Sequence, residues 1–195
     1  MADPSYIDPA TGVLTDGEAW VALGSTTLGG SAAVVTFTST DDGQVGDFSQ
    51  YLDLVVVWYG RSDRVATNND FIVQFNNDTG TNYAIQLLSG SGAAANAYAA
   101  TGGTFAYMGD LPAANSPANQ FSAGVATFFD VNSGKYKSTF AQSAKDVDGS
   151  GYSSIFAGTW QSQAPITEID LIASGENLVA GTRIDLFGVL PRMVA

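Results

Sequence analysis

The chain of 195 residues contains no cysteine and no histidine. Without cysteine it has no disulfide framework, no thiolate metal site and no thiol nucleophile. Without histidine it lacks the commonest metal ligand and the side chain that most often acts as a general base near neutral pH. Nucleophilic machinery of the Ser–His or Cys–His kind is therefore excluded, and we expect a protein that is not an enzyme and holds no cofactor.

Basic residues are also scarce, because seven Lys and Arg stand against 19 Asp and Glu and leave a net charge of −12. The seven are scattered along the chain and form no basic patch. Affinity for nucleic acids comes largely from neutralising phosphates with Lys and Arg, so we expect no nucleic-acid partner. Part of the acidity simply keeps a surface with few charges soluble.

Long hydrophobic runs are missing as well. The longest apolar run, residues 54–59, is far shorter than the roughly 20 residues that a membrane-spanning helix needs. The first residues, MADPSYIDPATG, contain neither a basic nor an apolar stretch and do not have the pattern of a secretory signal. We therefore expect no membrane partner.

The sequence does contain many short segments rich in Val, Ile, Phe, Tyr, Trp and Thr, separated by clusters of Gly, Asn, Asp and Ser. This spacing is typical of antiparallel β-sandwiches, and no segment has the period of a long amphipathic helix. We expect strands at residues 19–23, 33–39, 52–60, 70–76, 83–88, 121–131, 136–141, 153–161, 166–172 and 182–189. One core can stabilise a chain of this length, so we predict a single all-β domain over residues 18–195.

Several predicted strands are apolar on both faces. In the strand at 52–60, three alternating residues can line the core while Val55, Val57 and Tyr59 line the opposite face. In a two-layer sandwich the outer face should be polar, so these residues need a cover, either a long loop or another subunit. The pattern does not separate these two covers, and we take all three residues as interface candidates.

The first 17 residues are predicted to form an extended arm. Pro4 and Pro9 lie there among turn-forming Asp and Gly residues, and such an arm can fray or can clasp a neighbouring subunit. Tyr6 and Ile7 are the arm's candidates for that contact.

Residues 89–120 are dominated by Gly, Ala, Asn and Ser and are predicted to form a long loop insertion. This insertion is the candidate lid over an apolar strand face. Its aromatic residues Tyr98, Phe105 and Tyr107 indicate that part of it is ordered, as a further strand.

The sequence DVDGSG at 146–151 matches the opening of a calcium-binding loop, with oxygen ligands on Asp146, Asp148 and Ser150. The twelfth position, where a bidentate Glu belongs, is Ala157, and no flanking helices are predicted. A tight turn between two neighbouring strands explains the same Asp and Gly residues. We favour the turn.

Scattered acidic residues leave a carboxylate-based hydrolase open as an alternative, because such an enzyme needs neither His nor Cys. Asp41 and Asp42 lie in a turn-like segment, and Asp63 and Asp70 flank a loop. The sequence shows no pair of them across a groove, and scattered loop acids are rarely catalytic.

The segment NNDTGTN at 76–82 joins two strong strands. Its composition supplies the positive φ angles that a hairpin connection requires. Exposed Asn and Asp residues beside aromatic ones can also form a sugar-binding site, and this interpretation stays open.

Three stretches resemble the jelly-roll structural proteins of tailed bacteriophages, which serve as head decoration or cement proteins and in fibre or receptor-contact domains. The first, YLDLVVVWYGRSD at 51–63, is similar to a hydrophobic strand that ends in an Arg-containing loop. The second, FIVQFNNDTGTNYAIQL at 71–87, resembles a strand, an Asn-Asp-Thr-Gly turn and an Asn-Tyr opening of the next strand. The third, ITEIDLIASGENLVAGTRIDLFGV at 166–189, looks like a closing hairpin.

The resemblance covers most of the chain from about Trp20 onward, and its motifs are turn and strand signatures rather than catalytic ones. It implies an antiparallel two-sheet jelly-roll β-sandwich, which we expect to assemble as a dimer or trimer. It further implies a cement or decoration protein that binds the major capsid protein on the outer surface of the virion. A tail-fibre module that recognises a receptor or a carbohydrate is the alternative.

Overall fold

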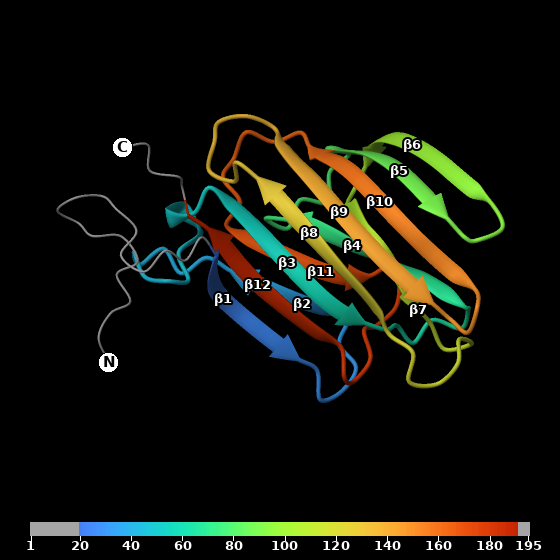
Figure 1. Cartoon of the computed structure of the whole chain (residues 1–195). Coiled ribbons are helices and arrows are strands. Elements are labelled where there is room, and N and C mark those ends of the chain that lie inside the picture. Colours follow the sequence, from blue (N-terminus) through green and yellow to red (C-terminus); the bar gives the residue numbers. More distant parts are fainter. Residues whose placement is uncertain (1–19, 191–195) are drawn as a thin grey trace.

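Twelve strands and one short 3-10 helix make up residues 20–190, the part of the chain that the computed structural model describes (Figure 1). The strands are β1 (Trp20–Thr27), β2 (Val34–Thr38), β3 (Asp53–Gly60), β4 (Asn68–Phe75), β5 (Tyr83–Gly90), β6 (Ala95–Gly103), β7 (Ala106–Pro112), β8 (Ser122–Phe129), β9 (Lys137–Asp146), β10 (Gly151–Trp160), β11 (Glu168–Ala173) and β12 (Arg183–Val189). The 3-10 helix, η1, spans Phe48–Gln50. Within this part of the chain, no helix is long and apolar enough to cross a membrane.

The strands form two antiparallel sheets that pack face to face. The large sheet has eight strands in the order β1-β12-β3-β8-β9-β10-β5-β6, and the small sheet has four in the order β2-β11-β4-β7. The blocks β1-β12-β3-β8 and β2-β11-β4-β7 together contain eight strands. From each of these strands to the next the chain changes sheets, except from β4 to β7, which is the jelly-roll arrangement. The predicted all-β, two-sheet jelly-roll sandwich is therefore confirmed.

Two inserted hairpins make the large sheet wider than the small one. The β5–β6 hairpin follows β4, the β9–β10 hairpin follows β8, and both join the same side of the large sheet beyond β8. Figure 1 shows β5 and β6 at the opposite end of this sheet from β1. The large sheet consequently extends past the small sheet, whose edge strand β7 lies against β9 and β10.

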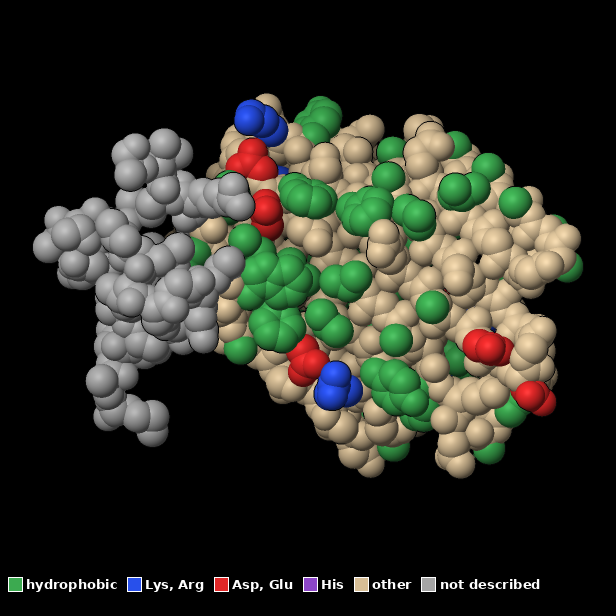
Figure 2. Space-filling model, in the orientation of Figure 1, with side chains coloured by type: hydrophobic (Ala, Val, Ile, Leu, Met, Phe, Trp, Pro, Cys, Tyr) green, Lys and Arg blue, Asp and Glu red, His purple; other side chains and the backbone are tan. Residues whose placement is uncertain are grey.

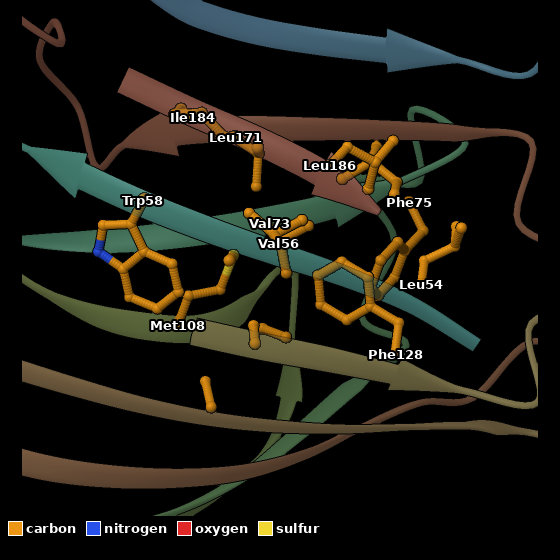
Figure 3. Close-up of a cluster of buried hydrophobic side chains, with 14 of the residues drawn as sticks. Leu54, Val56, Trp58, Val73, Phe75, Met108, Phe128, Leu171, Ile184 and Leu186 are labelled. Carbon is orange, nitrogen blue, oxygen red and sulfur yellow. The ribbon is translucent and has the colours of Figure 1, made fainter. Parts of the chain in front are cut away.

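The core lies between the sheets and contains several large side chains, most of them aromatic. Trp58, Phe75, Phe128 and Met108 are almost completely buried there (Figure 3). The rings of Phe75 and Phe128 meet edge to face, with centroids 4.9 Å apart, a geometry that adds about 0.5–1.5 kcal/mol beyond the burial of area. The alternation of each strand places these residues inward, as the sequence pattern predicts.

Each of the ten predicted segments overlaps a strand, but residues 89–120 are not one long loop. They contain β6 and β7, so the predicted loop insertion is wrong over half of its length, and the further strand predicted within it is confirmed. β6 consists mainly of Ala, Gly and Asn and is exposed along nearly its whole length. A strand that packs against few side chains needs no apolar alternation, so the sequence of β6 lacks the pattern from which strands are predicted. The predicted arm at residues 1–17, with Tyr6 and Ile7, lies outside the described residues.

Candidate functional site

On the outer face of β8, β9, β10, β5 and β6, four consecutive rows of paired residues contain no charged side chain. The outward residues in these rows are Ala123, Val125, Thr127 and Phe129 of β8, Ser138, Phe140, Gln142 and Ala144 of β9, Ser153, Ile155, Ala157 and Thr159 of β10, Ala84, Gln86, Leu88 and Gly90 of β5, and Ala95, Ala97, Ala99 and Thr101 of β6. We call these twenty residues the neutral face. Figure 2 shows the face, with the red and blue charged side chains at its margins.

The register of the strands arranges the neutral face in straight rows. In one row, Leu88 pairs with Ile155, Ile155 with Gln142, and Gln142 with Val125. Four strands from three separate parts of the chain thus contribute to a single row. Leu88, Ile155, Phe140 and Phe129 are the large apolar members, and all four are exposed.

Two shallow hollows mark the neutral face where small residues lie between the large ones. One, of about 870 Å³, is lined by residues that include Leu88, Ile155 and Val125. The other, of about 630 Å³, includes Phe140 and Phe129 in its lining. An exposed apolar surface that is continuous and hollowed is typical of an interaction site.

The predicted interface residues of β3 lie beside this face rather than at its centre. Tyr59, Val57 and Val55 pair with the outward residues of β8, so the predicted side of the strand is the outer one. Val55 is only 1% exposed and Val57 is half-buried, which leaves them little area for a contact. Tyr59 is 44% exposed, and its ring stacks on Phe121 at 4.9 Å. Sequence reasoning noted that several strands are apolar on both faces but did not join them into one surface. The absence of charge from residues 121–129, 138–144 and 153–160 was a further usable signal.

The segment at 146–151 is a hairpin turn, and the favoured interpretation of it is confirmed. It joins the paired strands β9 and β10, and the Gly149 N–H donates to Oδ1 of Asp146 at 2.9 Å. Asp148 and Gly149 take the positive φ angles of 66° and 83° that close the turn. Within residues 20–190, no group of three or more acidic side chains is placed to hold a metal ion.

The loop at 76–82 uses its polar side chains to hold the fold together. Asp78 accepts hydrogen bonds from Nε1 of Trp160 at 2.7 Å and from the Asn82 side chain and the Gly80 N–H. Asn76 donates to the Pro165 carbonyl and accepts from residues 167 and 168. Asn76 and Asn77 take the predicted positive φ angles, 53° and 55°. The predicted hairpin is nevertheless wrong, because β4 lies in the small sheet and β5 in the large one, so the loop crosses between the sheets. Its hydrogen bonds leave few free groups for a sugar here.

The acidic residues that the sequence singled out do not converge on a groove. Asp42 accepts from Thr40 and Gln44 within its own turn, and Asp63 is bound by the Asn177 side chain and backbone. Asp70 pairs across the small sheet with Asp110, a residue that sequence reasoning did not select. Burial and the neighbouring Asp110 carboxylate raise the pKa of Asp70, but neither residue lines the two hollows of the neutral face or the polar cavity at the β9–β10 turn.

A polar cavity of about 530 Å³ lies at the turn end of the β9–β10 hairpin. Its lining includes Asn68, Asn115, Tyr152 and Lys145. Lys145 is only 4% exposed, and its ammonium lies 4.9 Å from the centroid of the Tyr152 ring. Burial lowers the pKa of Lys145, while Asp110 and Asp70 act in the opposite direction. We call this the hairpin-end cavity. Sequence reasoning did not predict it, because nothing in the sequence separates Lys145 from the other scattered basic residues.

Comparison with known proteins adds little to this description. No protein-family model matches the chain, and no curated protein matches it. Among solved structures, the carbohydrate-binding module CBM40 of the Ruminococcus gnavus IT-sialidase, bound to α2,6-sialyllactose, shares 9% identity over 88% of this chain and 95% of its own. Its TM-score is 0.32, which is too low to relate the two chains in fold or function. The described residues themselves define the class of protein: a jelly-roll β-sandwich with an exposed neutral sheet face.

Proposed function

We propose that this chain is a virion structural protein, a cement or decoration protein that binds the major capsid protein on the outer surface of a tailed-bacteriophage head. The neutral face is the observation that carries the proposal, and we assign it as the docking surface. The resemblance of residues 51–63, 71–87 and 166–189 to phage jelly-roll proteins supplies the context. The lack of His and Cys supports a role without catalysis.

Charge explains why this face suits a protein partner. Buried charges need partners, and an unpaired one costs several kcal/mol, so a face without charge can be covered by a flat protein surface at little desolvation cost. The net charge of −12 disfavours nucleic acid as the partner. A stable protein interface buries about 800 Å² on each side, which is an area that a face of five strands can supply.

The role we propose is mechanical. A protein that binds only the assembled shell stabilises it by mass action. If the neutral face covers junctions between capsid subunits, expansion of the shell under internal pressure has to break these contacts first. The outer surface is the expected location because an acidic chain is repelled by the packaged genome.

A pair of matched variants tests the docking surface. Ile155 of the neutral face is 43% exposed, and Val34 on the small sheet is 42% exposed, so Ile155→Glu and Val34→Glu change comparable residues on opposite faces. Both are mixed with particles of the encoding phage that lack the protein, and bound protein is measured after sedimentation. We expect Ile155→Glu to abolish binding and Val34→Glu to bind normally. Equal binding by both folded variants, or no binding by the unaltered chain, would refute the proposal.

The hairpin-end cavity favours a second candidate, a tail-fibre module that recognises a carbohydrate. Its wall offers the Asn68 and Asn115 amides, the Lys145 ammonium and the Tyr152 ring, which together provide polar groups and one aromatic surface. A glycan array tests this candidate directly. Binding that Tyr152→Ala removes and Ile155→Glu preserves would support it, and low copy number in particles, against hundreds for a cement protein, would favour it further.

A further inference from the structure

β6 is the last strand of the large sheet, and its outer edge faces no other strand between residues 20 and 190. On its inner side it pairs with β5 from Ala95 to Gly103. Most of its residues are exposed, so no loop of the described chain covers them. An open edge of this kind presents unpaired backbone N–H and C=O groups, which form a template for another strand.

β6 also lacks the features that normally guard an edge. It contains no charged residue and no proline, and its pairing with β5 is regular until the shift between Tyr83 and Ala84 at its far end. The other edges are protected: β1 carries a bulge between Ala22 and Gly24, β2 has five residues, and β7 lies against β9 and β10 and ends at Pro112. β6 is therefore the edge most open to pairing.

The hairpin fixes which backbone groups of β6 point outward. The Ser91 N–H donates to the Ala94 carbonyl at 2.9 Å, so residues 91 and 94 occupy a hydrogen-bonded position of the β5–β6 ladder. Such positions alternate along an antiparallel pair. Asn96 and Tyr98 therefore bond to β5, while the N–H and C=O groups of Ala95, Ala97 and Ala99 point to the open edge.

These three alanines also make the edge self-complementary. A two-fold axis pairs a strand with its own copy in antiparallel register, which is the geometry of an isologous dimer. With the axis at Ala97, Ala95 of one copy lies opposite Ala99 of the other, and Tyr98 lies opposite Asn96. No charge is brought close at any of these positions, although each copy carries a net charge of −12.

We propose that two copies of this chain pair through their β6 edges, antiparallel about Ala97, to form one continuous sheet. The partner is a second copy because the edge complements itself in shape and is free of charge. The pairing places both neutral faces on the same side of the combined sheet and doubles the docking area. It does not depend on the proposed capsid role, since it uses the edge of the sheet and not its face.

Sedimentation velocity over a concentration series tests the proposal on the full chain. We expect a monomer–dimer equilibrium for the unaltered chain, and Ala97→Pro should raise its dissociation constant by about tenfold or more because it removes the outward N–H of both copies. This substitution spares the bonds to β5. Ala99→Lys, which places charge at the edge, should weaken the dimer as well, whereas Ala97→Thr and Ile155→Glu should leave it intact.

Amide hydrogen exchange gives a second readout that does not need a variant. Raising the protein concentration should slow exchange at Ala95, Ala97 and Ala99 and leave the amides of Asn96 and Tyr98, already bonded to β5, unchanged. A chain that stays monomeric at every concentration would overturn the proposal. A dimer that persists when both Ala97→Pro and Ala99→Lys are folded, or protection confined to the neutral face, would overturn it too. Failure of the unaltered chain to bind capsids, with its dimer intact, would instead count against the proposed function alone.

Discussion

Gly124 shows how closely single residues fit in this sandwich. It pairs with Trp58 across β3 and β8, and a Cβ at this position would lie 2.1 Å from Cζ2 of the indole. The indole therefore occupies the space that any larger residue at 124 would need. Trp58 is 1% exposed and has no room to move outward.

We predict that Gly124→Ala lowers the free energy of unfolding by about 3 kcal/mol, at the upper end of the usual cost of overpacking. Urea denaturation followed by tryptophan fluorescence measures the change. Gly134→Ala is the matched control, because nothing lies within 4 Å of its added methyl group, and it should stay within about 0.5 kcal/mol of the unaltered chain. Equal effects of the two substitutions would contradict the packing argument.

Asp63 links stability to pH at a single residue. Hydrogen bonds from the Asn177 side chain and then its backbone lower the pKa of Asp63 below the ordinary 3.8. The folded state therefore favours the carboxylate, and the stabilisation is present above pH 3.8 and lost as the pH falls through the lower folded pKa.

The stability difference between the unaltered chain and Asp63→Asn should accordingly be largest above pH 3.8 and shrink below it. Urea denaturation at a series of pH values measures this difference, in which the contributions of the other acidic residues cancel. A difference that stays constant across the acid range would show that Asp63 contributes through shape and not through its charge.

At the scale of elements, Arg61 organises the connection between β7 and β8. Its guanidinium donates to four carbonyl oxygens, those of Ala113, Ser116, Pro117 and Gln120, at 2.7–3.0 Å. A planar group with several fixed donors can serve four acceptors at once, and a lysine ammonium cannot. The Arg-containing loop noted in the sequence is thus a structural clamp.

We predict that Arg61→Ala destabilises the fold by about 2 kcal/mol and that Arg61→Lys recovers less than half of the loss. Hydrogen exchange at residues 113–120 should increase in both variants, since the loop loses its common donor. Exchange confined to that loop, with β9 and β10 unchanged, distinguishes loss of the clamp from general unfolding. Full recovery of stability by Arg61→Lys would mean that the positive charge alone, without the planar set of donors, holds the loop.

The composition of each strand explains where prediction of the strands from sequence succeeded and where it failed. Regular alternation predicts the strands β11 and β12, and both are found, but only β12 has an accessible outer face. β11 is largely buried on both faces, with Asp170 only 7% exposed. A further strand was predicted near Tyr98, but the bounds of β6 were not, because its Ala and Gly residues pack against little and backbone pairing with β5 holds it in place. β7 was hidden by the loop-like composition around it, although Tyr107 pointed to a strand there.

At the scale of the whole molecule, a net charge of −12 opposes any contact between two copies. The β6 edge carries no charge, so the repulsion comes from charges elsewhere on the two copies. These charges are far from the contact, and salt screens them effectively. Raising ionic strength from roughly 0.01 M to roughly 0.15 M shortens the Debye length from about 30 Å to about 8 Å.

We therefore predict that dimerisation through β6 becomes tighter over this range of salt. Sedimentation equilibrium in two different salts at equal ionic strength measures the effect and separates screening from specific ion binding. A dissociation constant that rises with salt would indicate attraction between opposite charges and would place the contact elsewhere on the surface.

The sequence by itself determined the class of the protein: an acidic all-β sandwich without His or Cys, with a turn at 76–82 and a hairpin at 146–151. These features are local, because the period of a strand and the φ angles of a turn are set by neighbouring residues. The tertiary structure alone decided which strands lie side by side. Leu88, Ile155 and Val125 are far apart in the chain, and only the register of β5, β10, β9 and β8 brings them into one uncharged row.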